Sequence, residues 1–195
     1  MGAQRFGDLL TGGWVRLAGH LNTDECAALA KPAGPSWTQM APKVGAVNQH
    51  GWFAQLPFHE VPPPVQALGS AMRATVSAAI GHSLPEWTDA TWQRYESGYG
   101  HIEPHRDQAI YKGVILIVTL AGEAEFTVLE SRDPPVTLDR WTTSAGDVVL
   151  LRGADLGAPG ARCPLHQVGR PASDRLTLTL RHSERGYTRW PTATA

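Results

Sequence analysis

The sequence predicts one mainly β domain with flanking helices, and three observations support this fold class. The chain has 195 residues, a length that suits a single domain with its own hydrophobic core. Its 20 glycines and 15 prolines exceed their average usage of about 7% and 5%, as in folds rich in turns. Several short apolar segments in the C-terminal half are bounded by glycine or proline, which indicates strands in a sandwich or barrel.

The composition excludes several classes of protein. Charged residues make up 18% of the chain and the net charge is −1, so neither disorder nor a global attraction to nucleic acid or anionic lipid is expected. Two cysteines cannot form a disulfide framework, and no apolar run is long enough to cross a membrane. The N-terminal segment lacks the layout of a secretion signal. We therefore expect a cytoplasmic protein without a membrane partner, and by default a monomer.

The first 90 residues carry helical signals between proline-rich loops. Asn22 precedes two acidic residues and an alanine-rich segment, a pattern that predicts a capped helix. The apolar residues of 65–80 follow helical spacing, and Gly81 ends that helix. Residues 36–61 contain four aromatic side chains in an otherwise polar segment, which indicates irregular strands or a loop; these are Trp37, Trp52, Phe53 and Phe58.

From residue 87 onward the pattern is strand and turn. Residues 114–120 form a continuous β-branched run between two glycines, which predicts a buried central strand. The other strands that we expect span residues 92–95, 125–129, 148–151 and 175–181.

The sequence around His105 carries the pattern of a metal site. On an extended chain, residues two apart face the same side, so His105 and Asp107 converge. His166, far downstream, supplies a third ligand. Two histidines and one carboxylate form the facial triad of non-haem Fe(II) oxygenases, which leaves coordination positions open for co-substrate and O2. The alternative interpretation is a turn histidine beside a solvated aspartate, because His-x-Asp alone arises often by chance.

The last predicted strand, 175–181, alternates without error. Its leucines share one face, and Arg175, Thr177, Thr179 and Arg181 share the other. The polar face could simply lie in water, as in many amphipathic strands. If it lies inside a barrel, the two guanidinium groups need anionic partners, and a dicarboxylic acid would supply them.

These motifs resemble those of the Fe(II)- and 2-oxoglutarate-dependent oxygenase superfamily, and within it most resemble AlkB-like proteins, over roughly residues 37–182. The motif His105-Arg106-Asp107 and the distal His166 match. The segment 175–181 is similar to the closing Arg-x-Asn-x-Thr-x-Arg motif. Gly146-Asp147 is similar to the Gly-Asp strand before the distal histidine, and Tyr95 with Gly98 resembles a Tyr-x-x-Gly motif.

The resemblance implies a double-stranded β-helix, the cupin-like jelly roll, for residues 91–182. Residues 1–90 would then supply N-terminal helices and a substrate-lid region within one domain, 1–195. It implies Fe(II), 2-oxoglutarate as co-substrate, and O2. The implied metal ligands, which are also the catalytic residues, are His105, Asp107 and His166. The implied co-substrate residues are Tyr95 as hydrogen-bond donor, Arg175 at the distal carboxylate, Thr177, and Arg181 nearer the metal-chelating end.

Three positions depart from the family pattern. Thr177 replaces an asparagine, and Gln93 stands where an asparagine is expected two residues before Tyr95. Ala109 occupies the place of the second acid that nucleobase demethylases of the family carry after the His-x-Asp motif. The oxygenase chemistry is therefore better supported than a nucleic-acid substrate.

Three functions follow for comparison. The leading hypothesis is a dioxygenase that oxidises a C–H bond of a small molecule and releases succinate and CO2. The second is an AlkB-like demethylase of nucleic acid or protein, which requires a basic groove formed by Lys43, Arg73, Arg94 and Arg106. The third is a cupin-like module that binds a metal or ligand without catalysis.

The remaining candidates have less specific roles. We expect His101 to be a surface turn residue, and Arg94 and Arg106 to form structural salt bridges. Arg152 either meets an anionic substrate or ends its strand in solvent. The four aromatic residues of 36–61 lie where AlkB-like proteins place their substrate lid, although core packing would explain each of them equally well.

Overall fold

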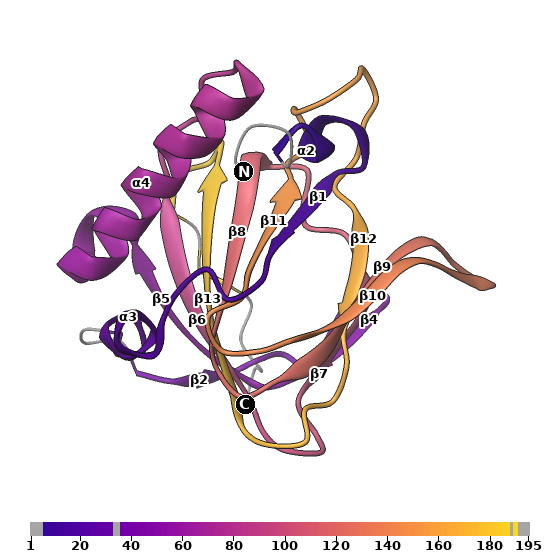
Figure 1. Cartoon of the computed structure of the whole chain (residues 1–195). Helices are drawn as coiled ribbons and strands as arrows, with labels where there is room; N and C mark the ends of the chain where they lie inside the picture. The colour runs from indigo at the N-terminus through magenta and orange to yellow at the C-terminus, as the bar shows by residue number, and fades with distance from the viewer. Residues whose placement is uncertain (1–5, 33–35, 188, 191–195) are drawn as a thin grey trace.

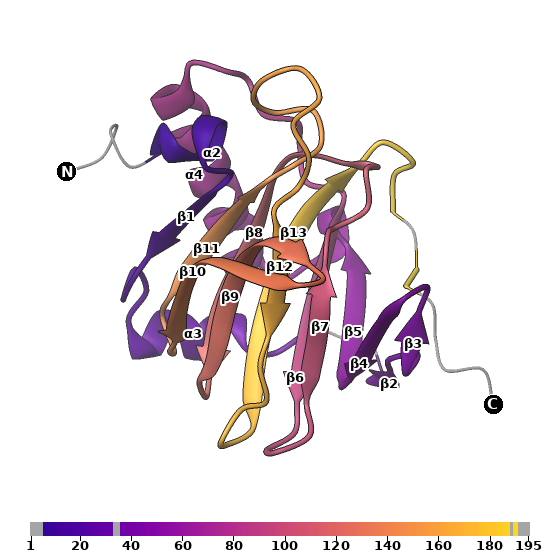
Figure 2. The ribbon, with the colours of Figure 1, turned by 90° about the vertical axis from the view of Figure 1, so that its right-hand side faces the viewer.

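The computed structural model describes residues 6–32, 36–187, 189 and 190, and its strands form two antiparallel sheets that face each other (Figures 1 and 2). Within the described residues, seven strands form the larger sheet in the order β1-β11-β8-β13-β6-β5-β2. Six strands form the smaller sheet in the order β10-β9-β12-β7-β4-β3. The two sheets make the predicted jelly roll. Residues 1–5 and 191–195, the ends of the expected domain, lie outside the described residues.

The larger sheet contains the strands β1 (Trp14–Leu17), β2 (Thr38–Gln39), β5 (Trp52–Pro57), β6 (Asp89–Tyr95), β8 (Tyr111–Ala121), β11 (Val148–Arg152) and β13 (Arg175–Ser183). The smaller sheet contains β3 (Lys43–Val44), β4 (Val47–His50), β7 (His101–His105), β9 (Ala124–Arg132), β10 (Pro135–Thr143) and β12 (Leu165–Val168). The helices are α2 (Asp8–Thr11), α3 (Thr23–Leu29), the 3-10 turn η1 (Phe58–Glu60) and α4 (Pro63–Ile80). Within the described residues, no helix is both long and apolar enough to span a membrane.

Both predicted helices are present, and their ends follow the expected local chemistry. The Asn22 side chain accepts a hydrogen bond from the Glu25 backbone N–H, and the Glu25 carboxylate accepts one from the Asn22 N–H. Pro63 opens α4 at a position where the missing N–H costs nothing. Gly81 ends α4 in the left-handed conformation, at φ +65°.

Helix α4 covers the outer face of the larger sheet, on the side away from the smaller sheet (Figure 1). Its buried Val65, Met72 and Val76 belong to one core cluster with Leu178 and Leu180 of β13. Phe58 packs against this cluster and lies close to Gly69 of α4. Of the two interpretations left open for Phe58, a substrate lid and core packing, the structure supports core packing, because the ring fills the space between the helix and the sheet.

Strand β13 is central in the larger sheet, because it pairs with β6 on one side and with β8 on the other. The alternation read from the sequence places Leu178 and Leu180 in the core under α4. Arg175, Thr177, Thr179 and Arg181 line a cavity between the two sheets. The polar face of this strand is thus turned away from bulk water.

Several strands were not predicted. Strands β1, β10 and β12 are short or contain many polar residues. The segment 36–61 forms four short strands, which is one of the two alternatives left open for it. Strands β1 and β12 gain their hydrogen bonds from partners that are distant in sequence, whereas β10 pairs with the adjacent strand β9. Local periodicity therefore carries little information about β1 and β12.

The turn between β8 and β9 generates a prediction about how β13 is positioned. Gly122 has φ +67°, and a Cβ placed there would lie 2.9 Å from the Cα of Arg175 and still closer to the Asp174 carbonyl oxygen. Gly19 has a similar φ, +57°, but open space around it. We expect Gly19→Ala to cost about 1–2 kcal/mol through backbone strain alone, and Gly122→Ala to cost clearly more. Chemical denaturation of both variants measures this difference, and equal losses would contradict the steric argument.

Candidate functional site

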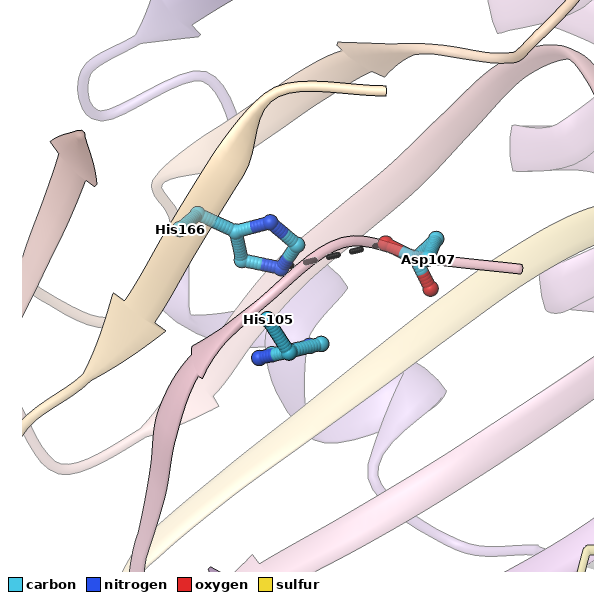
Figure 3. Close-up of side chains that lie close together, drawn as sticks. All are labelled: His105, Asp107 and His166. Atoms are coloured by element: carbon cyan, nitrogen blue, oxygen red, sulfur yellow. Dashed lines mark ion pairs between the residues drawn. The ribbon is translucent and has the colours of Figure 1, made fainter. Parts of the chain in front are cut away.

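Three potential metal ligands meet at one end of the cavity between the sheets. His105 ends β7, Asp107 follows two residues later, and His166 of β12 lies directly opposite His105 in the antiparallel pairing. Ligand atoms of all three lie within 4.8 Å of one another. His166 Nε2 is 3.8 Å from Asp107 Oδ2, and both imidazoles approach the carboxylate (Figure 3). The sequence-predicted triad is thus brought together by pairing between distant strands.

Backbone carbonyls fix the tautomer of both imidazoles. His105 Nδ1 lies 2.9 Å from the Glu103 carbonyl oxygen, and His166 Nδ1 lies 3.1 Å from that of Pro164. A carbonyl only accepts, so each Nδ1 carries the proton and donates it. Each Nε2 lone pair is then free for a metal, in the arrangement by which outer groups orient histidine ligands.

Burial keeps the His105 imidazole in its neutral form. Loss of water around the ring, followed by the nearby His166, lowers the pKa of His105 to about 4, although Asp107 acts in the opposite direction. The His166 ring stacks on Phe126 with centroids 5.4 Å apart, and the two imidazole centroids are 4.2 Å apart. These contacts hold two oriented imidazoles beside one carboxylate.

At the other end of the cavity lies Arg175, a buried cation that has no anionic partner among the described residues. Its side chain is only 2% exposed. One Nη donates to the hydroxyls of Thr119 and Thr143, each at 3.2 Å, and Nε has no hydrogen-bond partner in this part of the chain. Burial lowers the pKa of Arg175 to about 10, partly opposed by Tyr95. An anion is the partner that this guanidinium lacks.

Arg181 lies further along β13 on the same face of the strand, and it is paired with carboxylates instead. Its Nε lies 3.5 Å from Asp89 Oδ1, one Nη lies 4.0 Å from Asp107 Oδ1, and the other donates to the Thr91 hydroxyl at 2.7 Å. Burial raises the pKa of the Asp89 carboxyl, although Arg181 opposes that shift. Arg181 thereby connects a buried carboxylate to the metal-ligand cluster.

Two adjoining cavities connect these groups. The inner one has a volume of about 40 Å³ and is lined by the side chains of the His-Asp-His cluster and by residues of β6 and β13, among them Tyr95, Thr177 and both arginines. The second has a volume of about 200 Å³ and shares His105, Asp107 and Arg181 with the first. Burial raises the pKa of Tyr95 to about 12, so its hydroxyl remains a hydrogen-bond donor. The buried Thr177 hydroxyl has no hydrogen-bond partner among the described residues.

The other residues named from the sequence are distributed differently. Arg94 forms the expected salt bridge, with Asp174, at 3.3 Å. His101 begins β7 rather than lying in a turn, and its Nδ1 is 2.7 Å from the Tyr99 carbonyl oxygen. Arg152 donates to the backbone carbonyls of Leu10 and Arg162 and lines neither cavity at the site.

The expectation for Arg106 is wrong. Its side chain donates to the Cys163 carbonyl and lines the larger of the two cavities, beside His105 and Asp107. Strand β7 ends at His105, so the alternation that would have turned Arg106 away no longer applies.

Sequence reasoning also missed several residues of the site. Asp89 faces Arg181 because the two are paired across β6 and β13, and Thr119 and Thr143 reach Arg175 from two other strands. Val44 and Val47, in the hairpin of β3 and β4, line the larger cavity. Trp190 lines both cavities. Only the strand pairing could have identified Asp89, and no signal in the sequence points to the others.

No protein-family model and no curated protein matches the chain. In fold it is similar to a Pseudomonas putida prolyl-4-hydroxylase, with TM-score 0.63, 17% identity, and 93% of this chain and 98% of that one covered. It is similar to OsALKBH1, with TM-score 0.61, 17% identity, and 87% and 98% covered. It is also similar to SnoK, a non-heme alpha-ketoglutarate-dependent carbocyclase from nogalamycin biosynthesis, with TM-score 0.66, 12% identity, and 98% and 87% covered. The chain thus has the fold of these oxygenases, as its motifs implied.

Proposed function

We propose that the protein is an Fe(II)- and 2-oxoglutarate-dependent dioxygenase that oxidises a C–H bond of a small molecule. One observation carries this proposal: a buried guanidinium without an anionic partner lies in the same cavity as a His-Asp-His cluster. The first group requires an anion, and the second is a donor set suited to Fe(II). A dicarboxylic keto acid meets both requirements with one molecule.

The residues fit the metal. His105 and His166 present their Nε2 atoms, and Asp107 adds one carboxylate, so the set is the two-histidine, one-carboxylate triad of non-haem Fe(II) sites. The three come from one side of the cavity, which leaves room for exogenous ligands opposite them.

The residues also fit 2-oxoglutarate. Arg175 would bind its distal carboxylate, with the Thr119 and Thr143 hydroxyls keeping the guanidinium in place. Tyr95 and Thr177 supply hydroxyls along the cavity wall, and Arg181 adds positive charge near the metal ligands. Arg181 is already paired with carboxylates, whereas Arg175 has no anionic partner among the described residues. The distal carboxylate of a keto acid would therefore bind at Arg175, with its keto-acid end towards the metal ligands.

With Fe(II) and O2 bound, 2-oxoglutarate supplies the oxidising chemistry, because its decarboxylation to succinate and CO2 accompanies insertion of one oxygen atom into a substrate C–H bond. The protein's own contribution is positional. The imidazoles and Asp107 fix the ligand geometry, Arg175 anchors the co-substrate, and the apolar walls formed by Ile115, Ile117 and Phe126 exclude water from the cavity.

The cavity beside the ligands favours a small substrate or a small reacting group. Its volume of about 200 Å³ compares with about 150 Å³ for a cavity that holds one benzene molecule. Two of the four cations required by a nucleic-acid groove are already paired, Arg73 with Glu86 at 3.6 Å and Arg94 with Asp174 at 3.3 Å. These pairs weaken the case for the demethylase alternative.

The first prediction from the proposed function concerns the metal and the co-substrate together. Anaerobic addition of Fe(II) and 2-oxoglutarate to the protein is expected to produce a weak visible charge-transfer band, which His105→Ala and Asp107→Ala abolish. His101→Ala, a neighbouring histidine outside the cluster, is expected to keep the band. A wild-type protein that gives neither this band nor succinate in the presence of O2 would refute the dioxygenase and leave the non-catalytic binding module.

The second prediction separates binding from stability at Arg175. Replacing this buried cation by Met removes the anchor of the distal carboxylate, so affinity for 2-oxoglutarate should fall on the order of 10- to 100-fold. The melting temperature of the ligand-free protein should not fall, because a buried charge without an anionic partner is lost. Calorimetric titration and thermal unfolding measure the two effects. Arg73→Met, far from the cavity, should leave affinity unchanged, and a destabilised Arg175→Met with normal affinity would contradict the assignment.

The third prediction follows from the depressed pKa of His105. When the pH is below about 6.5, the ordinary pKa of histidine, His105 takes up a proton in the unfolded chain. In the folded protein, where its pKa is about 4, it does not. The metal-free protein should therefore lose stability as the pH falls from about 6.5 towards 4, at up to about 1.4 kcal/mol per pH unit from this group. In His105→Asn this component is absent, so its melting temperature should depend less on pH in this range. Equal pH dependence of the melting temperature in wild type and His105→Asn would contradict this role of His105.

A further inference from the structure

Trp190 lies where three cavities meet. It lines the inner cavity with Arg175 and Arg181, and it lines the larger cavity beside the metal ligands. It also lines a third cavity of about 280 Å³, together with Ser36, Thr38, Phe53, Gln55, Tyr187 and Arg189. Among the described residues, it is the one that borders all three cavities. The indole therefore separates the proposed co-substrate cavity from the third, outer cavity.

Interactions on several sides hold the indole in this position. The Arg181 guanidinium carbon lies 4.5 Å from the Trp190 ring centroid and 4.8 Å from that of Tyr111, so the cation contacts two aromatic faces. The Trp190 backbone N–H donates to Gln55 Oε1 at 3.1 Å. The Phe53 ring lies at a centroid distance of 5.6 Å. Trp190 is thus held by several specific contacts and does not simply rest on the surface.

The residues beneath the indole are those that would bind 2-oxoglutarate. Arg181 is 2% exposed, and the Trp190 ring forms part of what covers it. The inner cavity, about 40 Å³ in volume, extends from here to Arg175 and Tyr95. Bound 2-oxoglutarate would therefore lie on the inner side of the indole, and the outer cavity would lie on the opposite side.

We propose that Trp190 is a positioning residue that closes the co-substrate cavity and retains 2-oxoglutarate between Arg175 and the metal ligands. This inference rests on the proposed function. Removal of the indole would join the inner and outer cavities and uncover Arg181, so the co-substrate would leave faster. A phenyl ring at this position would keep an aromatic cover over Arg181.

The test measures how fast 2-oxoglutarate leaves the anaerobic Fe(II) complex. The complex is mixed with excess succinate, which lacks the keto group, and decay of the visible band gives the dissociation rate. Trp190→Ala should release 2-oxoglutarate at least tenfold faster than wild type, whereas Trp190→Phe should stay within about threefold of it. Tyr99→Ala, which removes a ring that is 70% exposed and lines none of the three cavities, is the matched control and should match wild type.

A second experiment distinguishes loss of the indole that covers the co-substrate cavity from a general loss of order in the Trp190→Ala variant. Added 3-methylindole, which has the shape of the missing side chain, should slow release from Trp190→Ala and leave wild type unaffected. If thermal unfolding shows that Trp190→Ala does not fold, Trp190→Leu takes its place in both arms. The role of Trp190 would be overturned if a folded variant that lacks the ring released 2-oxoglutarate at the wild-type rate. It would also be overturned if the variant released it faster and 3-methylindole did not slow that release. Absence of the band in the wild type would instead refute the proposed function.

Discussion

A guanidinium buried between two sheets without a carboxylate partner is the constraint on which the site depends. Arg175 satisfies part of its hydrogen-bonding capacity through two threonine hydroxyls, which accept hydrogen bonds but do not neutralise charge. Its desolvation lowers its pKa to about 10 and leaves it charged at neutral pH. Taking a single charge out of water costs several kcal/mol. Arg175 lies in a central strand of the larger sheet, where an anionic ligand in the cavity would offset this desolvation free energy.

Strand pairing places the rest of the site relative to that charge. Antiparallel pairing of β7 with β12 sets His105 opposite His166, and pairing of β6 with β13 sets Asp89 opposite Arg181 and Tyr95 opposite Arg175. The two sheets thus each contribute one wall, with the His-Asp-His cluster on the side of the smaller sheet and the arginines on the larger. A shift of either register by one residue would turn the functional side chains to the other face of their sheet.

The two arginines of β13 differ in environment although they face the same cavity. Arg181 is compensated by Asp89 and Asp107 and covered by aromatic rings, whereas Arg175 is enclosed by threonines and Tyr95. One guanidinium therefore serves as part of the protein's own electrostatic framework, and the other remains available to a ligand. The two arginines of one alternating motif therefore lie in different electrostatic environments.

The sequence by itself determined the features that depend on local order. Alternation in 175–181 predicted that leucines and polar residues lie on opposite faces of the strand. The two-residue spacing of His105 and Asp107 predicted their convergence, and the cap at Asn22 and the glycine at 81 marked helix ends. These follow from periods and turn chemistry within a few residues.

Only the tertiary structure decided which distant side chains share a cavity. Asp89, Thr119, Thr143 and Trp190 have no local pattern that distinguishes them, and they reach the site because strand order and the path of the chain after β13 bring them there. Arg106 turned towards the cavity and Phe58 away from it for the same reason, because the end of a strand and the packing of a helix override alternation. Contacts between residues far apart in sequence are set by the packing of the sheets, which no short window of sequence contains.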